Sequence, residues 1–336
     1  MDGRLGTRPA SVDSRKQVSP RRGTVRGMPR RPDLPQMPAG LVNLARRRSG
    51  VITAAEAYAH GITKSQVEAL VRSATWSALG RGTYLLSAWR APGGPTLAQR
   101  SWSAVLRSGS GAVVCGAAGW RLHGLDGAPE DAVIDVVMPA ASTRHQTSDR
   151  RYSWFELGPG DVVVIDGIHV LSVERLLIEA SRTASRAMFV SMLDSALHHQ
   201  RLSVEGLEAL RPSFAPRVAD WIGLADGRSE SALETHVRLI AVDGAVPPSD
   251  LNHTVWKGKT PIARIDLVWF RDARKVGLEA DGKKFHSAPE PLYRDRARQA
   301  ELTARGWVIV RVTWWDVINR PGWVLEQIRV HLYAAA

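Results

Sequence analysis

The sequence has very little cysteine and no long apolar run. Its 336 residues include one cysteine, Cys115, which excludes an internal disulfide and any zinc site built on several thiolates. No apolar stretch approaches the roughly 20 residues that a membrane-spanning helix needs. The arginine-rich N-terminus lacks the apolar segment of a secretory signal. We therefore expect a cytoplasmic protein without a membrane partner.

Negative charge is scarce at the N-terminal end. The formal net charge of the chain is +12, and residues 1–48 contain twelve Arg or Lys against three Asp. Basic arms bind polyanions by releasing counterions, and nucleic acid is the usual intracellular polyanion. The alternative is a solvated tail without a partner. Residues 1–38 are rich in Arg, Pro, Ser and Gly and lack aliphatic periodicity, which predicts a disordered basic tail.

Ordered structure is expected from AGLVNLARR onward, which predicts a short helix. Thr53 and Thr63 are good N-caps for two further helices, the second of which carries one apolar stripe. TWSALGRGTYLLS then predicts two strands joined by a glycine-containing turn. Residues 39–89 therefore have the element order of a winged helix-turn-helix.

A winged helix-turn-helix places its second helix in the major groove and its hairpin on the DNA backbone. This geometry predicts DNA contacts from the second helix and from the tip of the hairpin. The residues concerned are Lys64, Ser65, Gln66, Arg72 and Arg81. The alternative is a small helical domain that packs on a protein partner.

Two segments of this region carry a resemblance. GVITAAEAYAHGI at residues 50–62 and RGTYLL at residues 81–86 resemble the signature of the N-terminal winged-helix domain of AbiEi-type antitoxins. The resemblance implies a winged-helix fold and a cognate toxin as a partner. It leaves two interpretations open, because such a domain either contacts DNA or serves for protein docking alone.

Residues 90–215 have a mixed α/β pattern. TLAQRSWSAVL and AVVCGAAGWRLHGL predict helices, AVIDVVMP and DVVVIDGIHVLS predict strands, and VERLLIEASR and AMFVSMLDSALHHQ predict two more helices. The region resembles the part of AbiEi-like proteins that follows the winged helix. Its histidines are scattered without ligand spacing and predict no metal site: His123, His145, His198 and His199.

From residue 226 the pattern predicts a third domain. DGRSESALETHVRLIA reads as a helix capped by Ser229. Strands are expected at about 251–257, 262–270 and 275–281, followed by a helix from about 290 to 304, the strand WVIVRV and a last helix from about 322. The element order is αβββαβ.

Four carboxylates stand out in this third domain. Glu230 and Glu234 repel each other at a spacing of four on a helix unless Arg238 or a bound cation compensates. Strand alternation places Glu279 and Asp281 on one face of a strand.

A hairpin turn at RDARK would bring Asp266 beside that pair. Clustered carboxylates are unfavourable unless they are protonated, paired with bases or bridged by a metal. An oxygen-only set suits Mg²⁺ or Mn²⁺. The alternative is a structural cluster of ion pairs.

Three ordered motifs carry a second resemblance. RIDLVW from Arg264, LEADGKKFH from Leu278 and GWVIVR from Gly306 resemble segments of the very-short-patch-repair (Vsr-like) branch of PD-(D/E)XK endonucleases. The resemblance covers about residues 226–334. It implies a divalent-metal-dependent nuclease core that hydrolyses phosphodiester bonds.

The resemblance also implies individual roles. Asp266 and Glu279 match the two metal-binding acids, and Glu234 matches an acid that many members carry on the preceding helix. Asp281 stands where the wider superfamily has lysine, and it would serve the metal or a metal-bound water instead. His286 matches a histidine that acts as an acid or base.

The helix expected from about 290 to 304, between the second and third motifs, adds positive charge. Arg294 and Arg298 lie on one face with Asp295. This face is positioned either to orient the site and contact the DNA backbone, or to serve as plain surface charge.

The sequence therefore predicts an α/β protein with an N-terminal winged helix-turn-helix (39–89), a mixed α/β middle domain (90–215) and a restriction-endonuclease-like αβββαβ C-terminal domain (226–334). The predicted function is that of a DNA-binding, Mg²⁺- or Mn²⁺-dependent endonuclease. The alternative is a non-catalytic winged-helix regulator or antitoxin of a toxin–antitoxin system, with a cognate toxin as its partner. The missing lysine favours this alternative.

Overall fold

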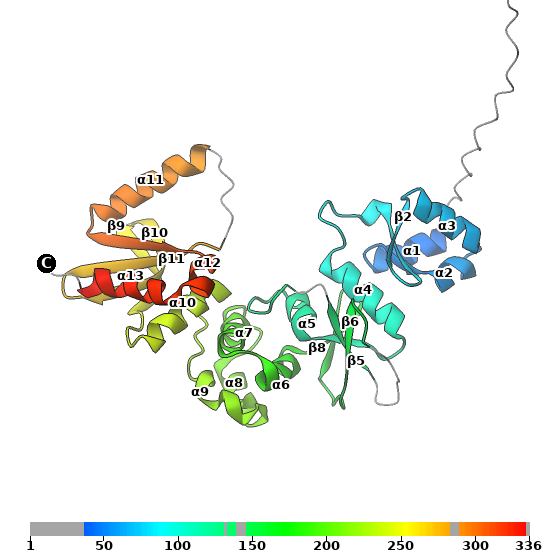
Figure 1. Ribbon diagram of the computed structural model, residues 1–336, viewed down its shortest axis with the longest axis horizontal. Coiled ribbons are helices and arrows are strands. Elements are labelled where there is room, and N and C mark those ends of the chain that lie inside the picture. Colours follow the sequence, from blue (N-terminus) through cyan, green and yellow to red (C-terminus); the bar gives the residue numbers. More distant parts are fainter. Residues whose placement is uncertain (1–36, 131–132, 139–145, 283–288, 334–336) are drawn as a thin grey trace, which may run out of the picture.

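A computed structural model describes residues 37–130, 133–138, 146–282 and 289–333. The fold is mixed α/β and contains three separate sheets. Figure 1 shows the N-terminal elements and the C-terminal elements at opposite ends, with the middle elements between them. None of the described helices is long and apolar enough to span a membrane. His286 and the basic segment 1–36 lie outside the described residues.

The N-terminal elements are three helices and a small antiparallel sheet with strand order β1-β3-β2. In chain order they are α1 (Ala39–Arg47), β1 (Val51–Thr53), α2 (Ala54–Ala59), α3 (Lys64–Arg72), β2 (Trp76–Gly80) and β3 (Thr83–Leu86). Thr53 caps α2 and Thr63 caps α3, each in a capping box with the third helical residue, Glu56 or Gln66. Both predicted N-caps are therefore confirmed.

The middle elements build a five-stranded mixed sheet of order β6-β5-β4-β8-β7. The chain runs through α4 (Leu97–Ser108), β4 (Val113–Cys115), α5 (Gly116–Leu122), β5 (Ile134–Met138), β6 (Arg150–Trp154), β7 (Val162–Ile165), β8 (Ile168–Leu171), α6 (Val173–Thr183), α7 (Arg186–His198), α8 (Val204–Leu210) and α9 (Ala219–Ile222). Phe189 of α7 is fully buried and packs against Phe214 and Trp221. The core under α6 and α7 thus continues to Ile222.

One predicted element of this region is wrong. The helix expected over AVVCGAAGWRLHGL begins only at Gly116, because Val113 and Val114 form strand β4. Branched side chains favour a strand, and Gly116 turns the chain with a positive φ of 58°. β6 was not predicted at all, because RRYSW has little apolar alternation.

The C-terminal domain is a four-stranded sheet of order β12-β11-β10-β9 with helices on both faces. Its elements are α10 (Ala232–Asp243), β9 (Asp250–Lys257), β10 (Thr260–Arg271), β11 (Arg274–Ala280), α11 (Pro289–Thr303), β12 (Trp307–Val312), α12 (Trp314–Asn319) and α13 (Pro321–Tyr333). α10 and α13 cover one face, where Leu267 and Leu278 are buried. α11 covers the other face, where Leu302 packs on Val268.

Strand pairing follows the predicted hairpin. β10 and β11 are antiparallel with Leu267 opposite Leu278, and Asp272 makes the turn with a positive φ of 53°. β12 joins β11 in parallel, which places Arg311 opposite Glu279. The short helix α12 was not predicted, and Ser231 rather than Ser229 caps α10. Ser229 is buried ahead of the helix.

Candidate active site

Asp266, in the middle of β10, is an acid with a strongly raised pKa. Its Oδ2 accepts a hydrogen bond of 2.7 Å from the Ala280 amide of β11. Burial, with a smaller contribution from the nearby carboxylates Glu234 and Glu279, raises the pKa of this carboxyl to about 6, against the lowering effects of the Ala280 hydrogen bond and of Arg264. The structure therefore brings three of the predicted site acids into electrostatic contact, with too little positive charge at Asp266 to balance them.

Glu279 lies on β11 and is held by two arginines. Its Oε1 accepts from Arg298 Nη2 of α11 at 2.7 Å, and its Oε2 accepts from Arg311 Nε of β12 at 3.2 Å. Asp295 of α11 accepts from Arg311 Nη2 at 2.8 Å and lies 3.5 Å from Arg298 Nη2. Arg298, which was predicted to contact DNA, is therefore bound to the second predicted metal acid. The side chain of Arg294 lies outside the described residues.

Asp281 follows the end of β11, so it is not on the strand that the alternation assumed. Its amide donates to the Val312 carbonyl at 2.7 Å. Asp281 lines a pocket of about 260 Å³ together with Arg264, Asp266, Glu279 and four further residues. It also lines a second pocket of about 570 Å³, which Glu234 and Trp314 share. Asp266 and Asp281 thus lie between the two pockets.

Glu234 stands in the first turn of α10 and is buried. Its Oε2 accepts from the Glu230 amide at 2.9 Å and its Oε1 accepts from Ser231 Oγ at 2.8 Å. The predicted repulsion from Glu230 on one helix face is wrong, because Glu230 precedes the helix and pairs with Arg264. Arg238 does not compensate Glu234 either, since it points to a different partner.

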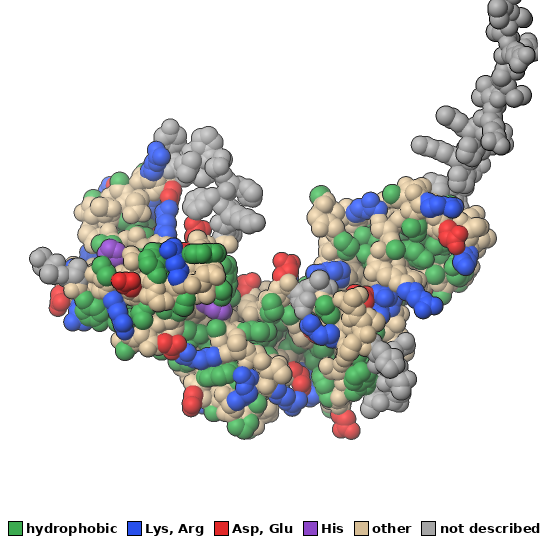
Figure 2. All heavy atoms as spheres, viewed as in Figure 1, with side chains coloured by type: hydrophobic (Ala, Val, Ile, Leu, Met, Phe, Trp, Pro, Cys, Tyr) green, Lys and Arg blue, Asp and Glu red, His purple; other side chains and the backbone are tan. Residues whose placement is uncertain are grey.

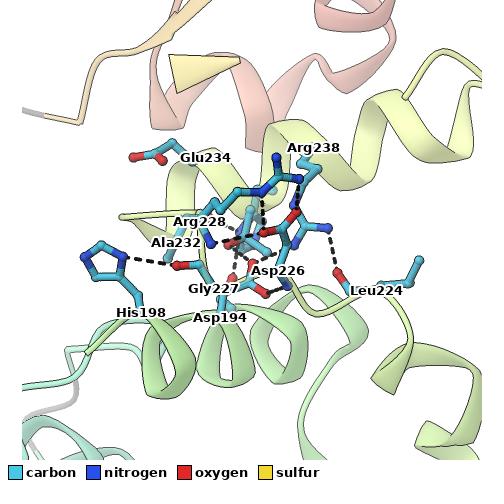
Figure 3. Close-up of polar contacts among 12 residues, drawn as sticks. Asp194, His198, Leu224, Asp226, Gly227, Arg228, Ala232, Glu234 and Arg238 are labelled. Carbon is cyan, nitrogen blue, oxygen red and sulfur yellow. Dashed lines mark hydrogen bonds and ion pairs between the residues drawn. The ribbon is translucent and has the colours of Figure 1, made fainter. Parts of the chain in front are cut away.

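That partner is Asp194 of α7, which fixes the helix that carries Glu234. Arg238 Nη2 and Thr235 Oγ1 each donate to Asp194 Oδ2 at 2.6 Å, and the Asp226 amide donates to Oδ1 at 2.7 Å. Figure 3 shows Glu234 pointing away from this network, from the same helix. Sequence reasoning missed Asp194, although an acid in the middle of the apolar helix MFVSMLDSALH is a signal of a buried ion pair.

The residues predicted to contact DNA in the N-terminal part lie mainly at the surface. Lys64, Ser65, Arg72 and Arg81 are exposed. Figure 2 shows basic side chains spread over the N-terminal elements, on the right of the view. Gln66 has a structural task, because its Oε1 accepts from the Thr63 amide at 2.8 Å in the cap of α3. Four of the five are therefore accessible to a ligand.

The acids predicted to bind a metal are present as oxygen donors, but the structure does not arrange them as a metal site. Among the described residues, no group of three or more His, Cys, Asp or Glu side chains is arranged to hold a metal ion. The chemistry of the donors nevertheless fits Mg²⁺ or Mn²⁺, since these are carboxylate oxygens. The pKa of Asp266 is raised chiefly by burial and in part by the charges of Glu234 and Glu279, which a divalent cation would offset. Glu279 would have to leave its arginines before it could bind such an ion.

Comparisons with known proteins bear on this domain. Residues 255–332 match the model of the restriction endonuclease-like family REase_MTES_1575. This match supports a restriction-endonuclease-like C-terminal domain and a nuclease-like function for it. Domains of this kind are generally dependent on divalent metals.

Relatives were found in Mycobacterium tuberculosis. The chain is 29% identical over 162 residues to the uncharacterized proteins MT2308 and Rv2248, which covers 46% of this chain and 58% of each relative. The match therefore spans little more than half the length of these relatives. The crystal structure of the RV2827C protein from the same species covers 65% of this chain and 87% of its own, with 19% identity and a TM-score of 0.38.

Proposed function

We propose that this protein is a DNA-binding, Mg²⁺- or Mn²⁺-dependent endonuclease whose C-terminal domain hydrolyses phosphodiester bonds. One observation carries the proposal: Asp266, in a restriction-endonuclease-like domain, has a pKa raised to about 6 by burial and by the carboxylates of Glu234 and Glu279. Structural acids are usually paired with bases, whereas perturbed carboxylates in a pocket are typical of functional sites.

Asp266, Glu279 and Asp281 would hold the cation, which supplies a polarised phosphate and a water of lowered pKa when bound. The remaining roles belong to the chain itself. Glu234 lines the larger pocket next to Asp266 and would orient the groups around it. His286 is the proposed acid or base.

The N-terminal part would bring the nuclease domain to DNA. Its order of helix, strand, two helices and two strands, closed into a sheet of order β1-β3-β2, supports a winged helix. On this interpretation the exposed N-terminal end of α3, with Lys64 and Ser65, lies in the major groove, and Arg81 at the β2–β3 turn contacts the backbone.

The experiment that tests the enzyme is nicking of supercoiled plasmid by the purified full chain with Mg²⁺ or Mn²⁺. Asp266→Asn keeps a hydrogen-bond acceptor for the Ala280 amide while it removes the charge. Asp272→Asn is the matched control, since Asp272 is exposed in the β10–β11 turn. Nicking by the wild type and the control, but not by Asp266→Asn, supports the proposal. Equal nicking by all three preparations means a contaminating nuclease.

A second candidate is a non-catalytic winged-helix regulator or antitoxin, with a cognate toxin as its partner. The observation that favours it is the double engagement of Glu279 by Arg298 and Arg311, where the nuclease proposal needs a free carboxylate. Aspartate at position 281, in place of the superfamily's lysine, points the same way. Salt-dependent binding to its own promoter, with no cleavage under any divalent metal, would select this candidate.

A further inference from the structure

Four charged side chains form a closed ring on the α11 side of the sheet. Glu279 accepts from Arg298 and Arg311, and Asp295 contacts the same two guanidinium groups. The ring joins three elements, because Glu279 lies on β11, Asp295 and Arg298 lie on α11, and Arg311 lies on β12. Two acids and two bases balance within it.

The ring borders the pocket of about 260 Å³ that also contains Asp266. Both arginines are more accessible than Glu279, since the side chains of Arg298 and Arg311 are 29% and 35% exposed, against 13% for Glu279. The side chain of Asp295 is also 35% exposed. A ligand that enters the pocket therefore meets guanidinium groups before it meets the Glu279 carboxylate.

Guanidinium groups bind carboxylate and phosphate with the same two-pronged geometry. A backbone phosphate can thus take over the donors that Glu279 and Asp295 now use, exchanging charge-assisted hydrogen bonds of the same kind. The exchange has a second effect. It frees both oxygens of Glu279, which cannot hold a cation while two guanidinium groups donate to them.

We propose that Arg298 and Arg311 form a subsite for a backbone phosphate of nucleic acid, which Glu279 and Asp295 close in the free protein and which opens when the phosphate displaces these carboxylates. The inference rests on the proposed function, because it assigns the free Glu279 to the cation. According to this proposal, Glu279 competes with a DNA phosphate for Arg298 and Arg311 as long as no metal is present.

This competition predicts opposite changes in DNA affinity when Glu279 and when its arginine partners are replaced. Without divalent metal, Glu279→Gln strengthens binding of DNA, because Arg298 loses its closest charged partner and Arg311 loses one of its two. Arg298→Gln and Arg311→Gln each weaken binding. Because the two arginines share one phosphate, each lowers the slope of log affinity against log salt by at most about 0.9, the value for one phosphate contact on duplex DNA.

The experiment measures the affinity of the full chain for a fluorescent 20-base-pair duplex by anisotropy in EDTA. Two control variants make the same changes of charge away from the pocket. Glu301→Gln in α11 is the control for Glu279→Gln, and Arg305→Gln, just after α11, is the control for Arg298→Gln. Glu301 pairs with Lys257 and Arg305. We expect Glu279→Gln to tighten binding about 3- to 10-fold and Glu301→Gln less than about 2-fold. We expect Arg298→Gln to weaken it about 5- to 10-fold and Arg305→Gln less than about 2-fold.

All variants are also measured in a chain that carries Lys64→Ala and Arg72→Ala, which removes the proposed α3 contacts with DNA. Equal shifts for Glu279→Gln and Glu301→Gln overturn the subsite, and so does an Arg298→Gln affinity equal to that of Arg305→Gln. Circular dichroism at the assay temperature confirms that each variant is folded. Plasmid nicking is scored separately, so the subsite can fail while the nuclease proposal stands, and the reverse.

A second measurement reports on the cation and not on activity. Free Mn²⁺ counted by electron paramagnetic resonance gives its affinity for the protein without DNA. We expect Arg298→Gln to bind Mn²⁺ about 3- to 10-fold more tightly than Arg305→Gln, because one guanidinium no longer competes for Glu279. Equal Mn²⁺ affinity in these two variants counts against the exchange.

Discussion

Arg238 donates a 2.6 Å hydrogen bond to Asp194, and this contact links α10 of the C-terminal domain to α7 of the middle region. Both side chains are buried. A buried pair does not by itself stabilise a fold relative to apolar residues, but removal of one partner leaves an uncompensated buried charge. The helix that carries Glu234 is therefore held in place by the neighbouring region.

Asp194→Ala should lower the free energy of unfolding by about 3 to 5 kcal/mol, because it strands Arg238 and Thr235 without their acceptor. The same two helices provide the control. Arg186 of α7 and Asp243 of α10 form an exposed pair at 2.7 Å, so Asp243→Ala should cost less than about 1 kcal/mol. Urea denaturation of the three proteins measures both changes. Similar losses in the two variants would contradict the assignment.

Asp266→Asn should stabilise the protein at neutral pH in the absence of divalent metal. The ordinary pKa of an aspartate is 3.8 and that of folded Asp266 is about 6, so the unfolded chain releases this proton at lower pH than the folded one. The free energy of unfolding of the wild type therefore falls as the pH rises from about 4 to 6, by at most about 3 kcal/mol from this group.

Asparagine does not titrate, so the Asp266→Asn variant lacks this pH-dependent loss of stability. Its stability relative to the wild type should rise between pH 4.5 and pH 7.5 and then remain level, as thermal melts at several pH values would show. A variant that is destabilised by the same amount at every pH would mean that Asp266 is an ordinary structural acid.

Mg²⁺ or Mn²⁺ should raise the melting temperature of the wild type. A ligand that binds only the folded state stabilises it by about 2.7 kcal/mol at 100 times its dissociation constant. Asp266→Asn should lose most of this gain and Asp272→Asn should keep it, and excess EDTA should reverse it. A metal-induced shift that persists in Asp266→Asn would place the cation elsewhere.

Lys64→Ala should weaken DNA binding and lower its salt dependence without a loss of stability, because Lys64 is exposed at the first position of α3. Gln66→Ala should behave differently. Gln66 accepts from Thr63 in the helix cap, so its removal should cost about 0.5 to 2 kcal/mol of stability as well. Anisotropy and thermal melts on the same preparations separate the two effects. Unchanged DNA binding in Lys64→Ala favours the protein-docking interpretation of this region.

Local patterns were sufficient for much of the C-terminal domain. The alternation in RIDLVWF and KVGLEA predicted β10 and β11 and their hairpin, and Asp266 and Glu279 are electrostatic neighbours as expected. Threonine caps predicted both N-terminal helices that they begin. These features depend on residues close together in the chain or on one turn.

The failures depend on partners that are distant in the chain. Nothing near Arg238 in the sequence indicates that it pairs with Asp194, 44 residues earlier. Of the two alternatives for Glu234, compensation by Arg238 or by a cation, the first is therefore wrong. The sequence predicts helix at residues 113–115, because these residues are followed by Gly116 and several alanines. They form strand β4 because they pair with β5 and β8, which lie far away in the sequence. The hydrogen bonds from Arg298 and Arg311 to Glu279 form only when α11 packs on the sheet. The periodicity of apolar residues predicts the helix and the strands but not how they pack on each other.

The parallel pairing of β11 with β12 also bears on how the protein is made. Glu279 leaves the ribosome well before Arg311, and only the crossover through α11 brings them opposite each other. Until that closure Glu279 lacks Arg311, one of the two guanidinium groups that donate to it in the folded domain. The charge ring is thus completed only once β12 is in place, so the proposed phosphate subsite cannot form before the last strand of this sheet has paired.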